Sequence, residues 1–131
     1  METVVVAAPD EEERRWLVET LQRAGYIVRD ARDQAEALAL IVKEPRALVI
    51  AADDTPPGPA AQLVAALREA TLAPIVVIGD ERLMTRLEAL TLGADYYDPR
   101  PVLEPLLLSR VRSLFRRWGR QQGENGGTER R

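Results

Sequence analysis

The side chains most able to do chemistry in this sequence are carboxylates that directly follow apolar runs. Asp53 and Asp54 follow one such run and precede a proline-rich stretch, and Asp10 follows another. Carboxylate oxygens are the ligands that a hard cation such as Mg²⁺ takes in proteins. Three interpretations stay open: a solvated turn in which the aspartates bond their own backbone, a residual metal or phosphoryl site that joins Asp53 to Asp10, and a hydrogen-bonded pair of Arg100 with one of these carboxylates.

Composition excludes most other kinds of catalytic site. The chain has no histidine and no cysteine, so it has no Ser-His-Asp or Cys-His set, no thiol nucleophile and no zinc site of the usual kind. Neither the glycine-rich fingerprint of dinucleotide-binding proteins nor the P-loop motif occurs. We therefore predict that the protein is not an enzyme.

The apolar pattern indicates the scaffold that must position these carboxylates. Continuous apolar runs are typical of strands buried on both faces of a parallel sheet. Three such runs and two weaker strands are predicted, at residues 4–8, 27–28, 47–52, 75–78 and 95–97. Helical spacing follows each strand, and right-handed crossovers then give an open, doubly wound α/β sheet with five strands and five helices.

Local signals mark where the helices begin and end. Asp10 precedes Glu13 by three residues, as an N-cap precedes its reciprocal partner, and Gly25 is placed to end the first helix in a left-handed cap. The fourth helix is predicted from leucines that mostly fill the core, at Leu83, Leu87 and Leu90. A site is expected where the carboxyl ends of the strands meet, near Asp10, Asp53, Gly79 and Arg100.

Length and charge suggest one domain with a basic end. The chain has 131 residues, and residues 1–108 hold 11 basic and 19 acidic side chains, whereas residues 109–131 hold seven arginines and two glutamates. We predict a domain over residues 1–118 and a flexible basic tail or linker over residues 119–131. No apolar run approaches the length of a membrane span and the start is not a basic signal region, so we expect a cytoplasmic protein.

Four stretches carry a resemblance to a known family. They are residues 23–26 (RAGY), residues 92–97 (LGADYY), the Arg100–Pro101 pair and residues 108–117 (LSRVRSLFRR). Together with the order of the five units, they make residues 3–117 similar to the receiver domain of two-component response regulators. The resemblance implies a flavodoxin-like fold.

Receivers of this family accept a phosphoryl group on an aspartate, beside a carboxylate pair that holds Mg²⁺, a Ser or Thr, and a Lys. In this chain the carboxylate pair falls on Ala8 and Pro9, the hydroxyl position on Gly79 and the Lys position on Arg100. The planar fork of an arginine is a poor substitute for a lysine's point charge. The resemblance therefore implies a degenerate pocket with no metal and no cofactor.

The acceptor position is ambiguous. Counting back from the third helix places it on Ala52, whereas counting forward from the first strand also admits Asp53. Asp10 lies one residue beyond the carboxylate pair. Asp10 and Asp53 are metal ligands only under the alternative of a receiver that is phosphorylated on Asp53 with Mg²⁺.

The resemblance also implies a switch and an interaction face. Tyr97 matches the family's signalling aromatic, with a half-buried strand tyrosine as the plain structural alternative, and Pro101 is expected to follow a cis peptide bond. The face formed by the fourth helix, fifth strand and fifth helix is the one that receivers use for dimers and output domains. In this chain it offers Leu83, Leu87, Asp95, Arg112 and Arg116, the last three for pairs across subunits.

The favoured function is a pseudo-receiver that signals by binding a protein partner or by forming a homodimer through that face. The basic end of the fifth helix resembles receivers that precede a winged-helix DNA-binding domain. A transcriptional output domain is therefore expected, with DNA contact only through it and no membrane contact. A further alternative is a small flavodoxin-like ligand-binding protein or enzyme.

Overall fold

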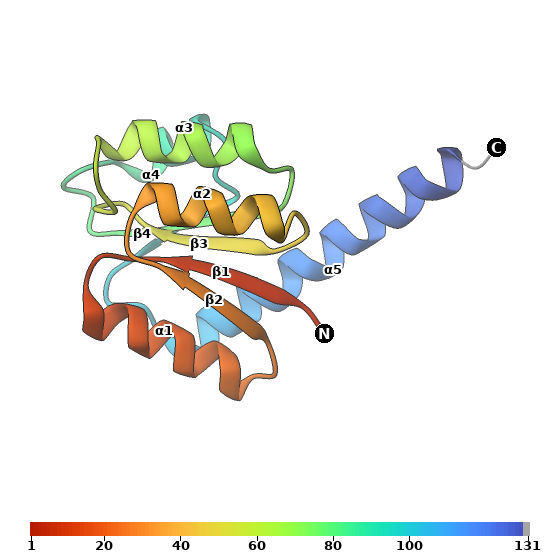
Figure 1. The fold of residues 1–131 in the computed structure, drawn as a ribbon, viewed down its shortest axis with the longest axis horizontal. Coiled ribbons are helices and arrows are strands. Elements are labelled where there is room, and N and C mark those ends of the chain that lie inside the picture. The colour runs from red at the N-terminus through yellow and green to blue at the C-terminus, as the bar shows by residue number, and fades with distance from the viewer. Residues whose placement is uncertain (130–131) are drawn as a thin grey trace.

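Five parallel strands and five helices alternate along the chain. The computed structural model describes the backbone of residues 1–129 and the side chains of residues 1–120. The strand order is β2-β1-β3-β4-β5 (Figure 1), which confirms the predicted α/β, flavodoxin-like sheet. The elements are β1 (Thr3–Ala7), α1 (Glu11–Arg23), β2 (Ile27–Ala31), α2 (Gln34–Lys43), β3 (Leu48–Ala52), α3 (Ala60–Ala70), β4 (Ile75–Gly79), α4 (Arg86–Thr91), β5 (Tyr96–Pro99) and α5 (Glu104–Glu129).

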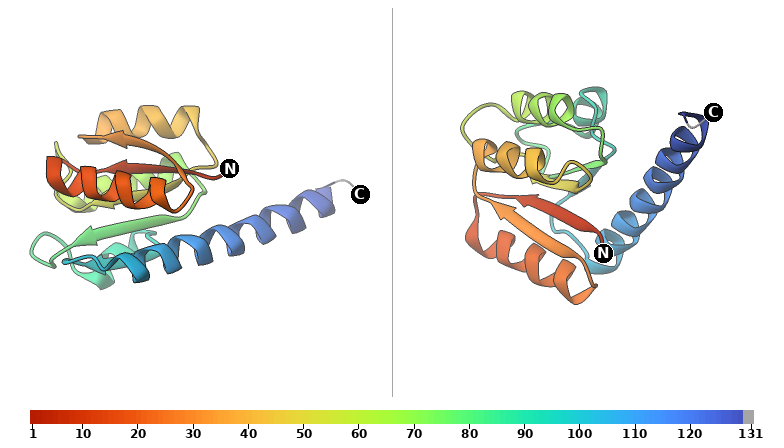
Figure 2. Two further views of the ribbon diagram at one scale, coloured as in Figure 1. Left: turned by 90° about the horizontal axis from the view of Figure 1, so that it is seen from below. Right: turned by 45° about the vertical axis from the view of Figure 1, so that its right-hand side comes forward.

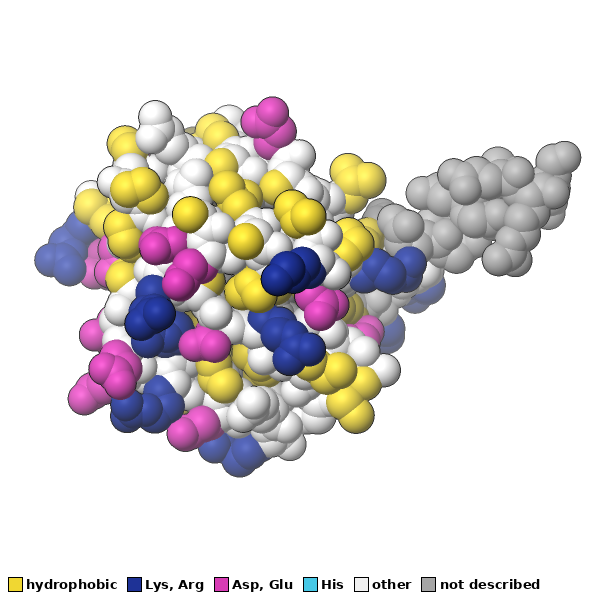
Figure 3. Space-filling model, in the orientation of Figure 1, with side chains coloured by type: hydrophobic (Ala, Val, Ile, Leu, Met, Phe, Trp, Pro, Cys, Tyr) yellow, Lys and Arg dark blue, Asp and Glu magenta, His cyan; other side chains and the backbone are white. Residues whose placement is uncertain are grey.

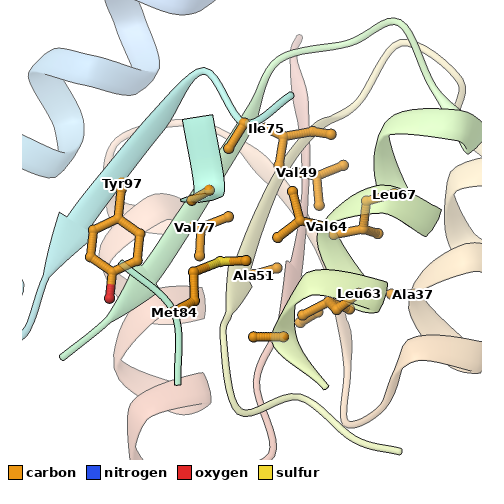
Figure 4. Close-up of a cluster of buried hydrophobic side chains, with 14 of the residues drawn as sticks. Ala37, Val49, Ala51, Leu63, Val64, Leu67, Ile75, Val77, Met84 and Tyr97 are labelled. Atoms are coloured by element: carbon orange, nitrogen blue, oxygen red, sulfur yellow. The ribbon is translucent and has the colours of Figure 1, made fainter. Parts of the chain in front are cut away.

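Helices cover both faces of the sheet. α1 and α5 lie on one face, and α2, α3 and α4 lie on the other (Figures 1 and 2). The continuous apolar runs follow from this arrangement, because alternate residues of β3 and β4 point to opposite buried faces. Val49 and Ala51 belong to the cluster under α2 and α3 (Figure 4), whereas Leu48 and Ile50 belong to the cluster under α1 and α5.

The predicted ends of α1 are confirmed. The Asp10 side chain accepts a hydrogen bond from the Glu13 backbone N–H at 2.8 Å, which makes Asp10 the N-cap. Gly25 has φ +99°, a left-handed conformation that glycine adopts without strain. The prediction that Glu13 is the reciprocal partner of the Asp10 N-cap is wrong. Its carboxylate instead accepts hydrogen bonds from Arg100.

The prediction that the leucines of the fourth helix fill the core is wrong. α4 begins only at Arg86, so Leu83 precedes the helix. Ala89 is the buried residue of α4, and Met84 is buried just before the helix, whereas Leu83 and Leu87 are 59% and 74% exposed. The consequence is an apolar surface beside β5 and α5.

α5 packs as predicted and then continues beyond the sheet (Figure 2). Leu107, Val111 and Leu114 face the core, and the helix passes Trp118 without a break. The side chains after residue 120 lie outside the described residues. A domain boundary at residue 118 with a flexible tail over 119–131 therefore stays a prediction.

The surface shows no charge of one sign gathered on the face drawn in Figure 3, where basic and acidic side chains are interspersed. Among the described residues, no helix is both long enough and apolar enough to span a membrane.

Candidate functional site

Arg100 is the centre of a polar cluster at the carboxyl end of the sheet. Its Nε and Nη2 donate to the two oxygens of Glu13 at 2.8 and 3.1 Å, and Nη2 also donates to Asp54 Oδ1 at 3.1 Å. Nη1 lies 3.8 Å from Asp53 Oδ1 and 4.0 Å from Asp80 Oδ2. We call Glu13, Asp53, Asp54 and Asp80 the carboxylate ring. The predicted hydrogen-bonded pair of Arg100 with one of the carboxylates is formed with Asp54, whereas Asp53 lies beyond hydrogen-bond distance. Glu13 and Asp80 were not predicted as partners of Arg100.

The fold brings the ring together from three segments that are distant in sequence. Glu13 lies in the first turn of α1, Asp53 and Asp54 directly follow β3, and Asp80 directly follows β4. The backbone N–H of Arg100 donates to the Gly79 carbonyl at 2.8 Å, which fixes Arg100 at the end of β5. The hydrogen bonds that Arg100 donates to Glu13 raise the pKa of its guanidinium, so its positive charge is permanent.

Asp53 is the buried member of the ring. Its side chain is only 1% exposed, which rules out the solvated-turn interpretation for Asp53, although Asp54 is 43% exposed. Burial raises the pKa of the Asp53 carboxyl; Arg100 lowers it, while Asp54 and Asp80 raise it further. Asp53 Oδ1 has no hydrogen-bond partner among the residues whose side chains are described. The carboxylate is therefore desolvated without full compensation.

Gly79 makes room for this carboxylate. A Cβ atom on Gly79 would lie 2.1 Å from Asp53 Oδ2 and 2.3 Å from the Tyr97 hydroxyl oxygen. The Tyr97 hydroxyl donates to Asp53 Oδ2 at 3.5 Å and accepts from the Glu81 backbone N–H at 2.9 Å. Burial raises the pKa of Tyr97, which keeps the phenol protonated as a donor. The space of the family's hydroxyl side chain is thus filled by Asp53 and Tyr97.

The carboxyl end of β1 contributes no acidic side chain to the cluster. Ala8 and Pro9 occupy the positions of the family's carboxylate pair, and Asp10 is engaged as the helix cap. Arg14 lies here instead: its Nη1 donates to the Ala8 carbonyl at 2.9 Å, and its Nε lies 3.2 Å from Asp30 Oδ2. The structure therefore does not join Asp53 to Asp10.

Ala52 is the last residue of β3 and is fully buried. Of the two candidate acceptor positions, only Asp53 places a carboxylate beside Arg100. Thr55 steadies this turn, because its hydroxyl lies 2.7 Å from the Ala52 carbonyl and 3.2 Å from the Ala7 carbonyl.

The residues at this edge do not match the oxygen set that Mg²⁺ requires. Mg²⁺ takes near-octahedral oxygen ligands at short distance. The family's first-strand positions supply a methyl group and a proline ring, and the carboxylates that do converge are already arranged around a guanidinium. Within the described residues, no group of three acidic side chains has a geometry ready for a metal ion.

The second predicted region, beside α4, β5 and α5, divides into apolar and polar parts. Its exposed leucines are Leu83, Leu87, Leu90, Leu103 and Leu106. Asp95 is bound within the chain, because it accepts from the Ile75 N–H at 2.8 Å and pairs with Arg68 at 3.4 Å. Arg112 and Arg116 are exposed. Arg100–Pro101 is a cis peptide bond, as predicted.

The sequence analysis missed an ion pair in this region, of which the aspartate is buried and the arginine is partly exposed. Asp98 is 7% exposed and pairs with Arg110, whose guanidinium lies 4.7 Å from the centre of the Tyr96 ring. The signal was an aspartate inside an otherwise apolar strand. Glu13 was missed for another reason, because its spacing from Asp10 already had a local explanation.

Comparison with known proteins identifies relatives. No family model matches the chain. It is 30% identical over 130 residues to the transcriptional regulatory protein CpxR of Escherichia coli (strain K12), covering 95% of this chain and 55% of the relative. It is 26% identical over 114 residues to the transcriptional regulatory protein HprR of the same organism, covering 86% and 51%. The chain thus spans about half the length of these curated relatives.

This chain matches solved structures of similar fold over nearly the whole length of those structures. The chemotaxis response regulator CheY4 of Vibrio cholerae has a TM-score of 0.75 at 26% identity, with 87% of this chain and 98% of that chain covered. The receiver domain of the response regulator TorR has a TM-score of 0.79 at 24% identity, with 89% and 98% covered, and supports the fold alone. The sheet order and these relatives together show that the chain has the receiver fold of two-component response regulators and is related to them in sequence.

Proposed function

We propose that this receiver domain is a pseudo-receiver, which works through protein–protein interaction without conventional phosphorylation of an aspartate. The observation that carries the proposal is the state of Asp53, the candidate acceptor. Its side chain is 1% exposed, and Arg100 lies between it and the other carboxylates. A phosphoryl donor needs an oxygen that it can reach, and the carboxylate of Asp53 is buried.

The substitutions at the carboxyl edge support the same conclusion. Mg²⁺ neutralises charge that develops on a transferred phosphoryl group. Ala8 and Pro9 cannot ligate such an ion through their side chains, and Gly79 has no hydroxyl to bind a phosphoryl oxygen. We therefore expect neither Mg²⁺ nor another cofactor to be needed.

The apolar surface beside α4 supports a partner-binding role. Exposed apolar side chains that cluster on one face mark interaction sites more often than isolated ones do. Leu87 and Leu106 are 74% and 53% exposed on the two helices that flank β5. We propose that this surface binds a second copy of the chain and transmits its state to a transcriptional output domain. The names of the relatives, and their greater length, support such an output domain.

Phosphorylation is tested directly by mass spectrometry. The protein is incubated with acetyl phosphate and Mg²⁺, and separately with beryllofluoride and Mg²⁺. We expect no phosphoryl adduct on Asp53 and no change in melting temperature. An adduct on Asp53 would contradict the proposal and establish the alternative function, a receiver that is phosphorylated on Asp53 with Mg²⁺.

Dimer formation is tested by sedimentation or light scattering on the whole chain. Leu87→Asp places a charge in the apolar surface and is expected to shift the protein toward monomer. Leu72→Asp is the matched control, because Leu72 is 85% exposed and lies outside this surface, between α3 and β4. A monomeric wild-type protein, or equal effects of both variants, would contradict the proposed homodimer.

A further inference from the structure

We propose that the exposed side of α5 binds the phosphate backbone of duplex DNA through three arginines, without reading its sequence. The three are Arg112, Arg116 and Arg117, and we call them the arginine face. The inference goes beyond the proposed function, because it assigns a DNA contact to this domain itself and not only to an output domain. Only the choice of DNA over double-stranded RNA rests on the proposed function, since a transcriptional output domain would hold this surface near DNA.

The first support is positive charge that the chain leaves unpaired. Arg112, Arg116 and Arg117 are exposed, and none of them forms an ion pair among the residues whose side chains are described. Most other arginines with described side chains do pair with a carboxylate. No acidic residue occurs between Glu104 and Glu124, so α5 itself offers no carboxylate one turn away from these arginines.

A carboxylate beside the arginine face is already engaged elsewhere. Asp95 lines a hollow together with Arg117. Its carboxylate accepts from the Ile75 backbone N–H at 2.8 Å and pairs with Arg68 at 3.4 Å. Arg117 therefore keeps its charge for a partner outside the chain.

The second support is that the body of the domain holds α5 in place behind the arginine face. Phe115 stacks on Tyr26, with the ring centroids 5.7 Å apart. One turn further, the Arg46 guanidinium lies 5.5 Å from the centre of the Trp118 ring. The arginines are therefore carried by an anchored helix, and little ordering of the backbone has to accompany binding.

The spacing of the arginines gives a continuous basic strip. Arg112 and Arg116 are four residues apart, so they are neighbours on the helix surface, about 6 Å apart along its axis. Arg117 adjoins Arg116 around the helix, and Arg120, also exposed, continues the strip by one turn. This part of α5 lies at the outside of the domain (Figure 2). A strip of this kind matches a row of phosphates, the charge that dominates affinity for DNA.

The other side chains of this part of α5 favour a duplex over a membrane or a single strand. A helix that lies on a membrane inserts an apolar face, but over residues 109–117 the apolar side chains are buried against the sheet. The side chains that accompany the arginines on the outer side are Ser109 and Ser113. Single strands are bound by stacking of bases on aromatic rings, and Phe115 and Trp118 are already engaged by Tyr26 and Arg46.

The test measures binding of the whole chain to a fluorescent duplex of about 20 base pairs by anisotropy, over a series of NaCl concentrations. Each phosphate contact contributes a slope of about −0.9 to log K plotted against log [NaCl]. We therefore expect a slope of about −3 or steeper for the wild-type protein, with the same affinity for duplexes of unrelated sequence. We expect Arg112→Gln/Arg116→Gln/Arg117→Gln to lose about 3 from the magnitude of the slope and to bind at least about tenfold more weakly at low salt.

Two further variants separate the arginine face from net charge and from side-chain shape. Arg15→Gln/Arg32→Gln/Arg82→Gln is the matched control, because it removes the same charge from exposed arginines that already pair with carboxylates. It is expected to bind with a slope close to that of the wild-type protein. Lysine at all three positions of the arginine face keeps the charge and is expected to keep the slope, because a phosphate accepts a point charge as well. Melting curves establish that each variant is folded.

Several results would overturn the inference. They are wild-type protein that binds no duplex at low salt, equal losses in the two glutamine variants, and tighter binding to duplex RNA, to a single strand of the same sequence or to vesicles that contain phosphatidylserine. Failure here is distinct from failure of the proposed function. A phosphoryl adduct on Asp53, or a monomeric wild-type protein, contradicts the proposed function and leaves the salt dependence of DNA binding unchanged.

Discussion

The molecule has two buried aspartates, Asp53 directly after β3 and Asp98 within β5, and each buries a carboxylate near an arginine in a different way. Both side chains are less than one-tenth exposed, and in each one carboxylate oxygen lacks a hydrogen-bond partner among the described residues. Each lies near an arginine. Arg110 pairs directly with Asp98 and rests on the Tyr96 ring, whereas Arg100 is 3.8 Å from Asp53 and is shared among four carboxylates.

The difference shows how fully an arginine compensates a buried carboxylate when it pairs with one carboxylate and when it is shared among several. A dedicated pair compensates one buried charge, and removing either member leaves the other uncompensated. A shared guanidinium compensates none of its partners fully, but it links the segments that carry them. We therefore expect the Asp98–Arg110 pair to contribute mainly to the stability of the fold. We expect the carboxylate ring mainly to hold together the segments that form the pocket.

The largest expected effect is on the dedicated pair. Arg110→Met leaves Asp98 buried and unpaired, so we expect a loss of about 3–5 kcal/mol in the free energy of unfolding. Denaturant titration measures it. Arg112→Met, on an exposed position of the same helix, is expected to change stability by less than about 0.5 kcal/mol. Equal losses in both variants would show that the pair is not specifically stabilising.

A second check is whether Arg110→Met is rescued by removing its partner. Asp98→Leu in the Arg110→Met background replaces the stranded carboxylate with an apolar group of similar size. We expect it to recover most of the lost stability, because burying two apolar groups avoids the desolvation of the charges. No recovery would indicate that the loss comes from the packing of Arg110 on Tyr96.

The next effect tests the steric basis of the Asp53 position. In Gly79→Ala the new Cβ meets Asp53 Oδ2 and the Tyr97 hydroxyl, so we expect a loss of about 1–3 kcal/mol, as for overpacking in a core. In an Asp53→Ala/Tyr97→Phe background the same change is expected to be nearly neutral. Gly119→Ala, in α5 with open space around it, is the control and is expected to be neutral or stabilising. A large loss of stability in both backgrounds would show that the new methyl group clashes with atoms other than those of Asp53 and Tyr97.

The sequence predicts the scaffold well, since its signals are local. Continuous β-branched runs identify the three central strands, Asp10 and Gly25 mark the ends of α1, and the Arg100–Pro101 pair marks the β5–α5 turn. The exposed leucines were mispredicted because helical spacing alone does not give the phase of a helix as short as α4 against the sheet. Which face a helix buries depends on what its neighbours leave open.

The site was only partly predictable, because its geometry is set by long-range contacts. Asp53 was named as a candidate, but its direction depends on the register of β3 beside β4 and on the missing side chain of Gly79. Glu13 reaches a partner 87 residues away, and no local pattern distinguishes that role from helix capping. The side chains that meet at the ends of different strands can be predicted only when the order of the strands in the sheet is known.

A smaller effect is expected at the anchor of the shared arginine. Glu13→Gln keeps the shape but removes the charge, so we expect a loss of about 1 kcal/mol and greater mobility of Arg100. Glu12→Gln, at the neighbouring exposed position, is the control. Denaturant titration gives the stability, and NMR signals of the arginine Nε–H report the mobility. An unchanged Arg100 signal in Glu13→Gln would show that Asp54 suffices as its anchor.

The last expected change is of similar size but has the opposite sign and depends on pH. Burial raises the pKa of Asp53, so the folded state holds its proton to higher pH than the unfolded state does. The favourable contribution of the protonated group is therefore complete below the unfolded pKa and is lost as pH rises through the folded pKa. Asp53→Asn removes this loss, and we expect it to be more stable than the wild-type protein near neutral pH by about 1 kcal/mol, with no such gain at low pH. Melting curves across pH measure the difference. A variant that is less stable near neutral pH would mean that Arg100 does compensate Asp53 as fully as Arg110 compensates Asp98, and the contrast between the two aspartates would be lost.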